Sequence, residues 1–140
     1  MPCARTRWNS ACDTGRYRVT RFTCAHDCGF VVNPLSLRGT IEANLIQGMS
    51  RAMHEAVRFD ATRVLSTDWI SYPIVDMTEV PDVVDIVILG NEPTAKSRGA
   101  GEPATRPVAA AIANALHDAL GVRVRRVPLT AESVLAAIRA

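Results

Sequence analysis

The strongest strand signal in the chain is Val83-Val84-Asp85-Ile86-Val87-Ile88-Leu89, a run dominated by β-branched side chains. Such a run, bounded by turn residues, is typical of a strand that packs into a core. The polar stretch that follows, residues 90–101, is long for a loop inside a compact domain, and loops of this length commonly carry function. The sequence therefore predicts a strand over 83–89 and draws attention to the loop that leaves it.

That loop ends in Arg98-Gly99-Ala100-Gly101-Glu102-Pro103, ahead of an alanine-rich helical stretch. The two glycines leave the backbone thin and free to take positive φ, and the proline suits the first turn of a helix. A carboxylate at a helix N-terminus is favoured in its ionised form, in which it can accept a proton. The sequence thus makes Glu102 a candidate catalytic base. The alternative is a glycine-rich turn whose glutamate faces solvent.

Apolar residues recur at three- and four-residue steps in three further stretches and alternate less regularly in others. We expect helices over 37–57, 104–120 and 130–139, strands over 17–25, 64–70, 83–89 and 122–127, and a short strand over 30–32. Residues 1–14 are expected to be an irregular lead-in, and 15–140 a single segment. The fold class is α+β, with a mixed sheet and two main helices.

Length and composition exclude several classes of function. A chain of 140 residues points to one domain. A net charge of +2 and an aromatic content of 5%, with no aromatic residues interleaving the arginines, argue against nucleic acid as a partner. No apolar run reaches the roughly 18 residues that span a membrane, and no signal peptide is evident. The expected location is the cytoplasm.

The first predicted helix contains a second candidate site residue, Gln47, followed by Gly48. Glycine costs a helix about 1 kcal/mol relative to alanine, so Gly48 beside an apolar face indicates a close approach by backbone or ligand. The neighbouring amide of Gln47 can hydrogen-bond a ligand there. The alternative for Gln47 is an ordinary, partly exposed helix residue.

A third possibility is a small metal-binding module. Cys24, His26 and Cys28 lie within five residues, and all three are potential metal ligands. Their spacing to the remaining cysteines, Cys3 and Cys12, fits no usual zinc pattern. The alternative is the end of a strand with Cys24 packed inside.

An ordered series of motifs resembles the molybdenum hydroxylases, the family of xanthine dehydrogenases and aldehyde oxidases. The resemblance runs from about Asp13 to Ile138 and is similar to the C-terminal part of the molybdopterin-binding large subunit. The motifs, in chain order, are Cys24-Ala25-His26-Asp27-Cys28-Gly29-Phe30-Val31-Val32-Asn33-Pro34, Ile41-Glu42-Ala43-Asn44-Leu45-Ile46-Gln47-Gly48-Met49, Tyr72-Pro73, Glu79-Val80-Pro81, Gly99-Ala100-Gly101-Glu102-Pro103 and Arg123-Val124-Arg125-Arg126-Val127-Pro128-Leu129.

The resemblance assigns roles to residues and implies a cofactor, molybdenum–molybdopterin. Glu102 matches the family's active-site base in the hydroxylation of an aldehyde or N-heterocycle with water-derived oxygen. Gln47 with Gly48, and the loop Gly99-Ala100-Gly101, match segments that approach the cofactor. The implied partners are the remainder of the molybdopterin-binding subunit, an iron–sulfur electron-transfer subunit and the small-molecule substrate.

The chain also departs from the family pattern. Ala43-Asn44 stands where many relatives carry Gly-Gly, and Thr40 where glutamine is common, so both positions are expected to crowd or alter the cofactor contact. Family large subunits are several times longer, and the chain is similar to a C-terminal fragment. We therefore expect no activity without the rest of the subunit. The alternatives are a non-catalytic α+β remnant and the small metal-binding module.

Overall fold

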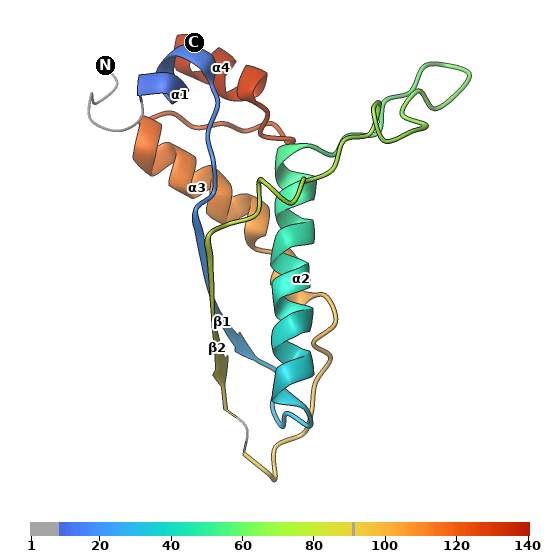
Figure 1. The fold of residues 1–140 in the computed structure, drawn as a ribbon, viewed down its shortest axis with the longest axis vertical. Coiled ribbons are helices and arrows are strands. Elements are labelled where there is room, and N and C mark those ends of the chain that lie inside the picture. Colours follow the sequence, from blue (N-terminus) through green and yellow to red (C-terminus); the bar gives the residue numbers. More distant parts are fainter. Residues whose placement is uncertain (1–8, 91) are drawn as a thin grey trace.

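The computed structural model describes residues 9–90 and 92–140. The elements are α1 (Asn9–Thr14), β1 (Arg21–Asp27), α2 (Pro34–Met53), β2 (Val83–Leu89), the 3-10 turn η1 (Pro103–Thr105), α3 (Val108–Leu120) and α4 (Ala131–Arg139). The predicted α+β class with two main helices is confirmed. The long helix α2 runs beside the two strands along the long axis of the molecule, while α1, α3 and α4 gather toward one end (Figure 1).

The sheet consists of β1 and β2, which pair in parallel from Arg21↔Val83 to Asp27↔Leu89. Parallel neighbours need a crossover connection, and α2 lies in the segment that joins them. The strand predicted over 83–89 is confirmed with its bounds. In the described part of the chain, antiparallel pairing is confined to one isolated bridge, between Phe59 and Val64, so the described sheet is parallel and not the mixed sheet expected.

Helix α2 begins earlier than the sequence indicated, at Pro34 rather than residue 37. The Asn33 side chain caps it, because its Oδ1 atom accepts a hydrogen bond of 3.0 Å from the amide of Ser36. The proline expected to break a strand occupies the first helical turn, where its missing N–H costs nothing. The helix ends at Met53 rather than residue 57.

The core forms where one face of α2 meets α3, the strands and the segment before α4. The most deeply buried side chains are Ile41, Met49, Val108 and Val134. They come from α2, α3 and α4, so the three helices share one core. The end of α3 is as predicted, since Gly121 adopts φ 73° and its amide donates to the carbonyl of His117.

Three predicted strands are wrong: 64–70, 122–127 and 30–32 contain no strand. Their β-branched residues satisfy the local preference, but a strand also needs a paired neighbour, and β1 and β2 pair only with each other. In the region of 64–70 the chain turns instead, with the side chain of Asp68 accepting hydrogen bonds from the amides of Ile70 and Ser71. The strand predicted over 17–25 is shifted and covers 21–27.

The remaining helical predictions are corrected at their starts. The helix expected over 104–120 is interrupted by Pro107, so a single 3-10 turn precedes α3. The last helix is confirmed within one residue, with Thr130 as its N-cap at 3.2 Å from the amide of Ser133. Part of the expected irregular lead-in is helical, over Asn9–Thr14, and residues 1–8 lie outside the described part.

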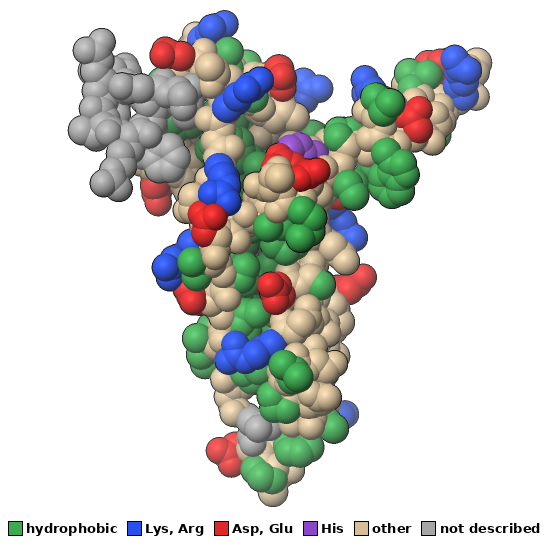
Figure 2. Space-filling model, viewed as in Figure 1, with side chains coloured by type: hydrophobic (Ala, Val, Ile, Leu, Met, Phe, Trp, Pro, Cys, Tyr) green, Lys and Arg blue, Asp and Glu red, His purple; other side chains and the backbone are tan. Residues whose placement is uncertain are grey.

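Residues 57–72, called the arm below, project away from the rest of the molecule (Figure 1). Hydrophobic side chains are exposed along it (Figure 2), namely Val57, Phe59, Val64, Leu65, Trp69 and Ile70. Trp69 is 78% and Ile70 92% exposed. Contiguous exposed apolar surface is a feature of interaction sites. None of the described helices is both long enough and apolar enough to cross a membrane.

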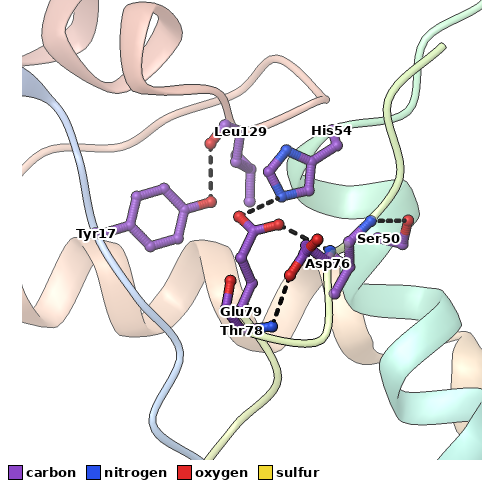
Figure 3. A network of polar contacts seen from close by, with 8 residues as sticks. Tyr17, Ser50, His54, Asp76, Thr78, Glu79 and Leu129 are labelled. Atoms are coloured by element: carbon purple, nitrogen blue, oxygen red, sulfur yellow. Dashed lines mark hydrogen bonds and ion pairs between the residues drawn. The ribbon is translucent and has the colours of Figure 1, made fainter. Parts of the chain in front are cut away.

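A polar network closes the C-terminal end of α2 (Figure 3). The Nε2 atom of His54 lies 3.1 Å from Oε1 of Glu79, whose Oε2 accepts a hydrogen bond from the amide of Asp76. The Tyr17 hydroxyl donates to the carbonyl of Leu129 at 2.8 Å, and burial raises the pKa of this phenol. The amide of Asp76 and the Tyr17 hydroxyl have hydrogen-bond partners within the chain, so these contacts join the segments around α2, whereas the buried Nε2 atom of His54 lies near Glu79 without hydrogen-bond geometry.

Candidate active site

The loop that carries Glu102 runs against the middle of α2. The contact is made by Asn44, a buried polar residue on the core-facing side of the helix that is 5% exposed. Its Nδ2 atom donates to the carbonyl of Gly101 at 2.6 Å, and its Oδ1 atom accepts from the hydroxyl of Thr105 at 2.6 Å. One side chain of α2 therefore holds the loop on both sides of Glu102.

Glu102 is exposed, and its side chain makes no hydrogen bond or ion pair within the described residues. Its backbone, by contrast, caps the N-terminus of η1, because its carbonyl accepts a hydrogen bond of 3.1 Å from the amide of Thr105. The expected place at the start of a helix is thus met by a 3-10 turn rather than by α3, which begins at Val108. An open carboxylate on a fixed backbone suits proton transfer to or from a ligand.

The two glycines of the loop face open space. A Cβ atom added to Gly99 or to Gly101 would meet no atom of the described structure within 4 Å. Neither glycine adopts the positive φ that the sequence made available to them. Between them, Ala100 is partly buried and packs against the core. The loop therefore rests on its alanine and leaves the Cα atoms of its glycines accessible to a group outside the chain.

The close approach predicted at Gly48 is present, and another part of this chain makes it. A Cβ atom at Gly48 would lie 2.8 Å from Cγ2 of Val108 and 3.2 Å from the carbonyl oxygen of Thr105. Helix α3 and η1 occupy this position. Gly48 shapes the site by letting them pack closely on α2.

Gln47 is exposed on α2. It follows Asn44 by three residues, and residues three apart lie next to each other on a helix surface. The side-chain amide of Gln47 thus lies on the helix surface next to Asn44, which bonds to the loop. The structure brings Gln47 and the loop Gly99–Glu102 to the same stretch of α2, but shows no bond between them.

The three potential metal ligands of β1 and its end do not form a cluster. Cys24, His26 and Cys28 are every second residue of an extended chain and so lie on the same face of it. Side chains two residues apart in such a chain are separated by about 7 Å. Among residues 9–90 and 92–140, no three His, Cys, Asp or Glu side chains lie close enough to hold a metal ion. His26 and Cys28 are buried, and burial raises the pKa of the Cys24 thiol.

Comparison with known proteins shows which family this arrangement belongs to. The family described as the molybdopterin cofactor-binding domain matches residues 9–81. The chain belongs to the molybdenum hydroxylase family. The match includes α1 and begins ahead of Asp13, so the resemblance extends farther toward the N-terminus than the motifs alone indicated.

Relatives of this molybdenum hydroxylase chain include a subunit of nicotinate dehydrogenase from Pseudomonas putida, which is 45% identical over 127 residues. The 6-hydroxypseudooxynicotine dehydrogenase complex subunit gamma of Paenarthrobacter nicotinovorans is 31% identical over 129 residues. These alignments cover 89% and 87% of the chain but only 10% and 16% of the relatives. The chain therefore spans a small part of the length of the curated proteins it matches.

Solved structures agree. Quinoline 2-oxidoreductase from Pseudomonas putida 86 superposes with a TM-score of 0.81 at 31% identity, over 90% of this chain and 17% of that one. Aldehyde oxidoreductase from Desulfovibrio gigas superposes with a TM-score of 0.77 at 33% identity, over 91% and 14%. The α+β arrangement is thus a part of a molybdenum hydroxylase fold, and the expected cofactor class, molybdenum–molybdopterin, is confirmed at the level of the family.

The residues present fit one flank of a site for such a cofactor. The open Cα atoms of Gly99 and Gly101 allow a close backbone approach by a large group, and the exposed amide of Gln47 and carboxylate of Glu102 remain free to contact it. One amide and one carboxylate cannot hold a molybdopterin by themselves.

Sequence reasoning missed the anchoring role of Asn44 and Thr105. From the sequence, Asn44 is only a departure from Gly-Gly that is expected to crowd the cofactor contact. The structure turns its side chain toward the loop instead. A signal is present, because Asn44 is a polar residue that directly precedes Leu45 on the apolar face of a predicted helix, and buried polar groups require partners.

Proposed function

We propose that the chain is the C-terminal part of the molybdopterin-binding region of an oxidoreductase that hydroxylates an aldehyde or an N-heterocycle with oxygen derived from water. Glu102 is the base, and Gln47 together with the loop Gly99-Ala100-Gly101 lies against the cofactor. Gly48 supports these residues through its packing with α3. The observation that carries the proposal is the carboxylate of Glu102, open to a ligand while the backbone on both sides of it is fixed.

The bound molybdenum–molybdopterin supplies the oxygen-transfer and electron-accepting chemistry of the hydroxylation. This chain would contribute proton transfer: an Oε atom of Glu102 would accept the proton of the water-derived oxygen as that oxygen bonds to the electron-poor carbon of the substrate, while the hydrogen and electron pair of the broken C–H bond would pass to the bound cofactor. General base catalysis of this kind contributes about 10²–10⁴-fold to a rate. The amide of Gln47 orients the cofactor edge by hydrogen bonding, and the glycines keep side chains out of the approach.

The proposed partners follow from the exposed surfaces. The arm presents exposed apolar side chains, which supports docking against the remainder of the molybdopterin-binding subunit. An iron–sulfur subunit would carry the electrons away, as expected for relatives that are subunits of dehydrogenase complexes. Nucleic acid is not a proposed partner. The proposed location is the cytoplasm, which cell fractionation tests.

The test is the substitution Glu102→Gln in the chain co-expressed with the upstream large-subunit segment and the iron–sulfur subunit. Glutamine keeps the shape of the side chain and removes its basicity, so turnover falls by about 10²-fold or more while molybdenum and pterin content stay unchanged. Glu92→Gln is the matched control, since Glu92 is an exposed glutamate earlier in the same loop and keeps full turnover. Full turnover in Glu102→Gln would overturn the assignment of the base.

The competing proposal is a non-catalytic α+β remnant that has kept the fold and lost the reaction. The parallel pair β1–β2 is a small part of a larger sheet in this view, and its open edges allow self-association. Co-expression separates the two proposals: the remnant gains no molybdenum, and it forms oligomers of the chain with itself.

A further inference from the structure

We propose that Asn44 is a positioning residue: it fixes the loop that carries Glu102, so that the carboxylate is presented from a rigid backbone. The functional meaning of this anchor rests on the proposed role of Glu102 as the base. The anchor itself is a matter of structure and can be tested without the cofactor.

The hydrogen bonds of Asn44 determine the orientation of its amide. The Nδ2 atom faces two carbonyl oxygens, those of Thr40 at 2.8 Å and Gly101 at 2.6 Å. With the amide reversed, Oδ1 would face both carbonyls without a proton between them. The observed orientation uses both N–H donors and leaves Oδ1 to accept from the Thr105 hydroxyl.

The two loop contacts lie on either side of Glu102. Gly101 directly precedes it, and Thr105 closes η1 by donating from its amide to the carbonyl of Glu102 at 3.1 Å. Ala104, between them, is only 4% exposed. The backbone around Glu102 is thus held by two hydrogen bonds to one buried side chain and by one buried methyl group, while the carboxylate itself remains exposed.

The link is specific to the amide at this position. A glycine or alanine at residue 44 has no side-chain atom that reaches Gly101 or Thr105, and keeps only the backbone carbonyl that lies 3.3 Å from the Thr105 hydroxyl. An aspartate has the same shape but no N–H, so its oxygen would face the carbonyls of Gly101 and Thr40 and repel both. Asparagine is therefore the side chain that satisfies two carbonyls and a hydroxyl at once.

The test measures hydrogen exchange by mass spectrometry at the backbone amides of Thr105 and Arg106. In the native chain these amides donate hydrogen bonds to the carbonyls of Glu102 and Pro103. Asn44→Asp and Thr105→Val are expected to speed this exchange about fivefold to tenfold, the effect of losing about 1 kcal/mol of hydrogen bonding. Thr105→Ser keeps the hydroxyl and is the matched control, with exchange as in the native chain. Exchange in β1 and β2 stays unchanged if the effect is local.

In the co-expressed enzyme, the same Asn44→Asp substitution lowers kcat, leaves KM unchanged and shifts the acidic limb of the kcat–pH profile. A structural role remote from Glu102 would not produce this combination of a lower kcat, an unchanged KM and a shifted acidic limb. Unchanged exchange at Thr105 and Arg106 in both Asn44→Asp and Thr105→Val would overturn the anchor, whatever Glu102 does. Full activity of Glu102→Gln together with accelerated exchange in Asn44→Asp would instead overturn the role of Glu102 as the base and support the contact of Asn44 with the loop.

Discussion

The side chain of Asn44 in α2 donates a hydrogen bond of 2.6 Å to the carbonyl of Gly101, the residue directly before Glu102. A buried residue in the middle of the longest described helix thereby fixes the backbone that carries an exposed carboxylate. Rigid elements place reacting groups more reliably than free loops do, because less conformational freedom is lost when the ligand is engaged. The long loop after β2 is fixed by this bond at the end that carries Glu102.

The close contact between α2 and α3 at Gly48 predicts a large difference between two glycines of the same helix. In Gly48→Ala the new methyl group meets Val108 at 2.8 Å, and overpacking of this kind costs about 1–3 kcal/mol. A methyl group at Gly39 would meet no atom within 4 Å, so Gly39→Ala stabilises the helix by roughly 0.5–1 kcal/mol. Urea unfolding of the two variants measures both values. Equal effects would contradict the packing described.

The open glycines of the loop predict a separation between folding and cofactor content. Gly99→Ala and Gly101→Ala change the free energy of unfolding of the chain by less than about 0.5 kcal/mol, since no atom of the chain opposes the added methyl. In the co-expressed enzyme, the same substitutions lower the molybdenum and pterin content, because the methyl fills the approach. Molybdenum and pterin contents equal to those of the native enzyme in both variants would show that solvent, and not the cofactor, fills the space beside the two glycines.

The exposed apolar side chains of the arm predict a partner surface. Trp69→Ser and Ile70→Ser leave the unfolding midpoint of the chain unchanged, since both side chains are exposed. The double variant binds the upstream large-subunit segment at least about tenfold more weakly, because burial of one large apolar side chain contributes roughly 1.5–3 kcal/mol. Arg63→Ser, on the same arm, is the control for loss of charge. Pull-down titration measures the affinity of each variant for the upstream segment. Unaltered binding of the double variant would show that the interface lies elsewhere.

Two acidic side chains predict how stability responds to acid. Hydrogen bonding from the Arg18 guanidinium lowers the pKa of Asp82, and hydrogen bonding from the amide of Thr78 lowers the pKa of Asp76. A carboxyl whose pKa is lower in the folded chain stabilises the fold above its unfolded pKa, about 3.9, and loses that contribution as pH falls. The urea midpoint therefore drops between pH 5 and about pH 3. In Asp82→Asn the urea midpoint falls less over the same pH range. A fall as large as in the native chain would contradict the pairing of Asp82 with Arg18.

Local sequence determined the elements whose signals are complete within a few residues. The run from Val83 to Leu89 is a strand with the bounds expected, and the cap of Thr130 and the stop at Gly121 are both present. The residues of 64–70 and 122–127 have strand-like composition but no neighbouring strand to pair with, and composition alone does not reveal that. The glycine loop with Glu102 is identifiable from its residue types.

The anchor of that loop could not be predicted from sequence spacing. Asn44 is 57 residues from Gly101 and 61 from Thr105, and their contact exists only because α2 and η1 are packed together. The same holds for Gly48, where the sequence predicts a close approach but does not reveal that Val108 makes it. Contacts between elements depend on the tertiary fold, so they become visible only in the structure.

The most direct test of the account measures molybdenum and pterin in the purified chain, alone and after co-expression with the upstream large-subunit segment. We expect both components in the co-expressed sample and neither in the chain alone, because one amide and one carboxylate cannot hold the cofactor by themselves. Absence of molybdenum from both samples would contradict the account and leave a folded remnant of the family.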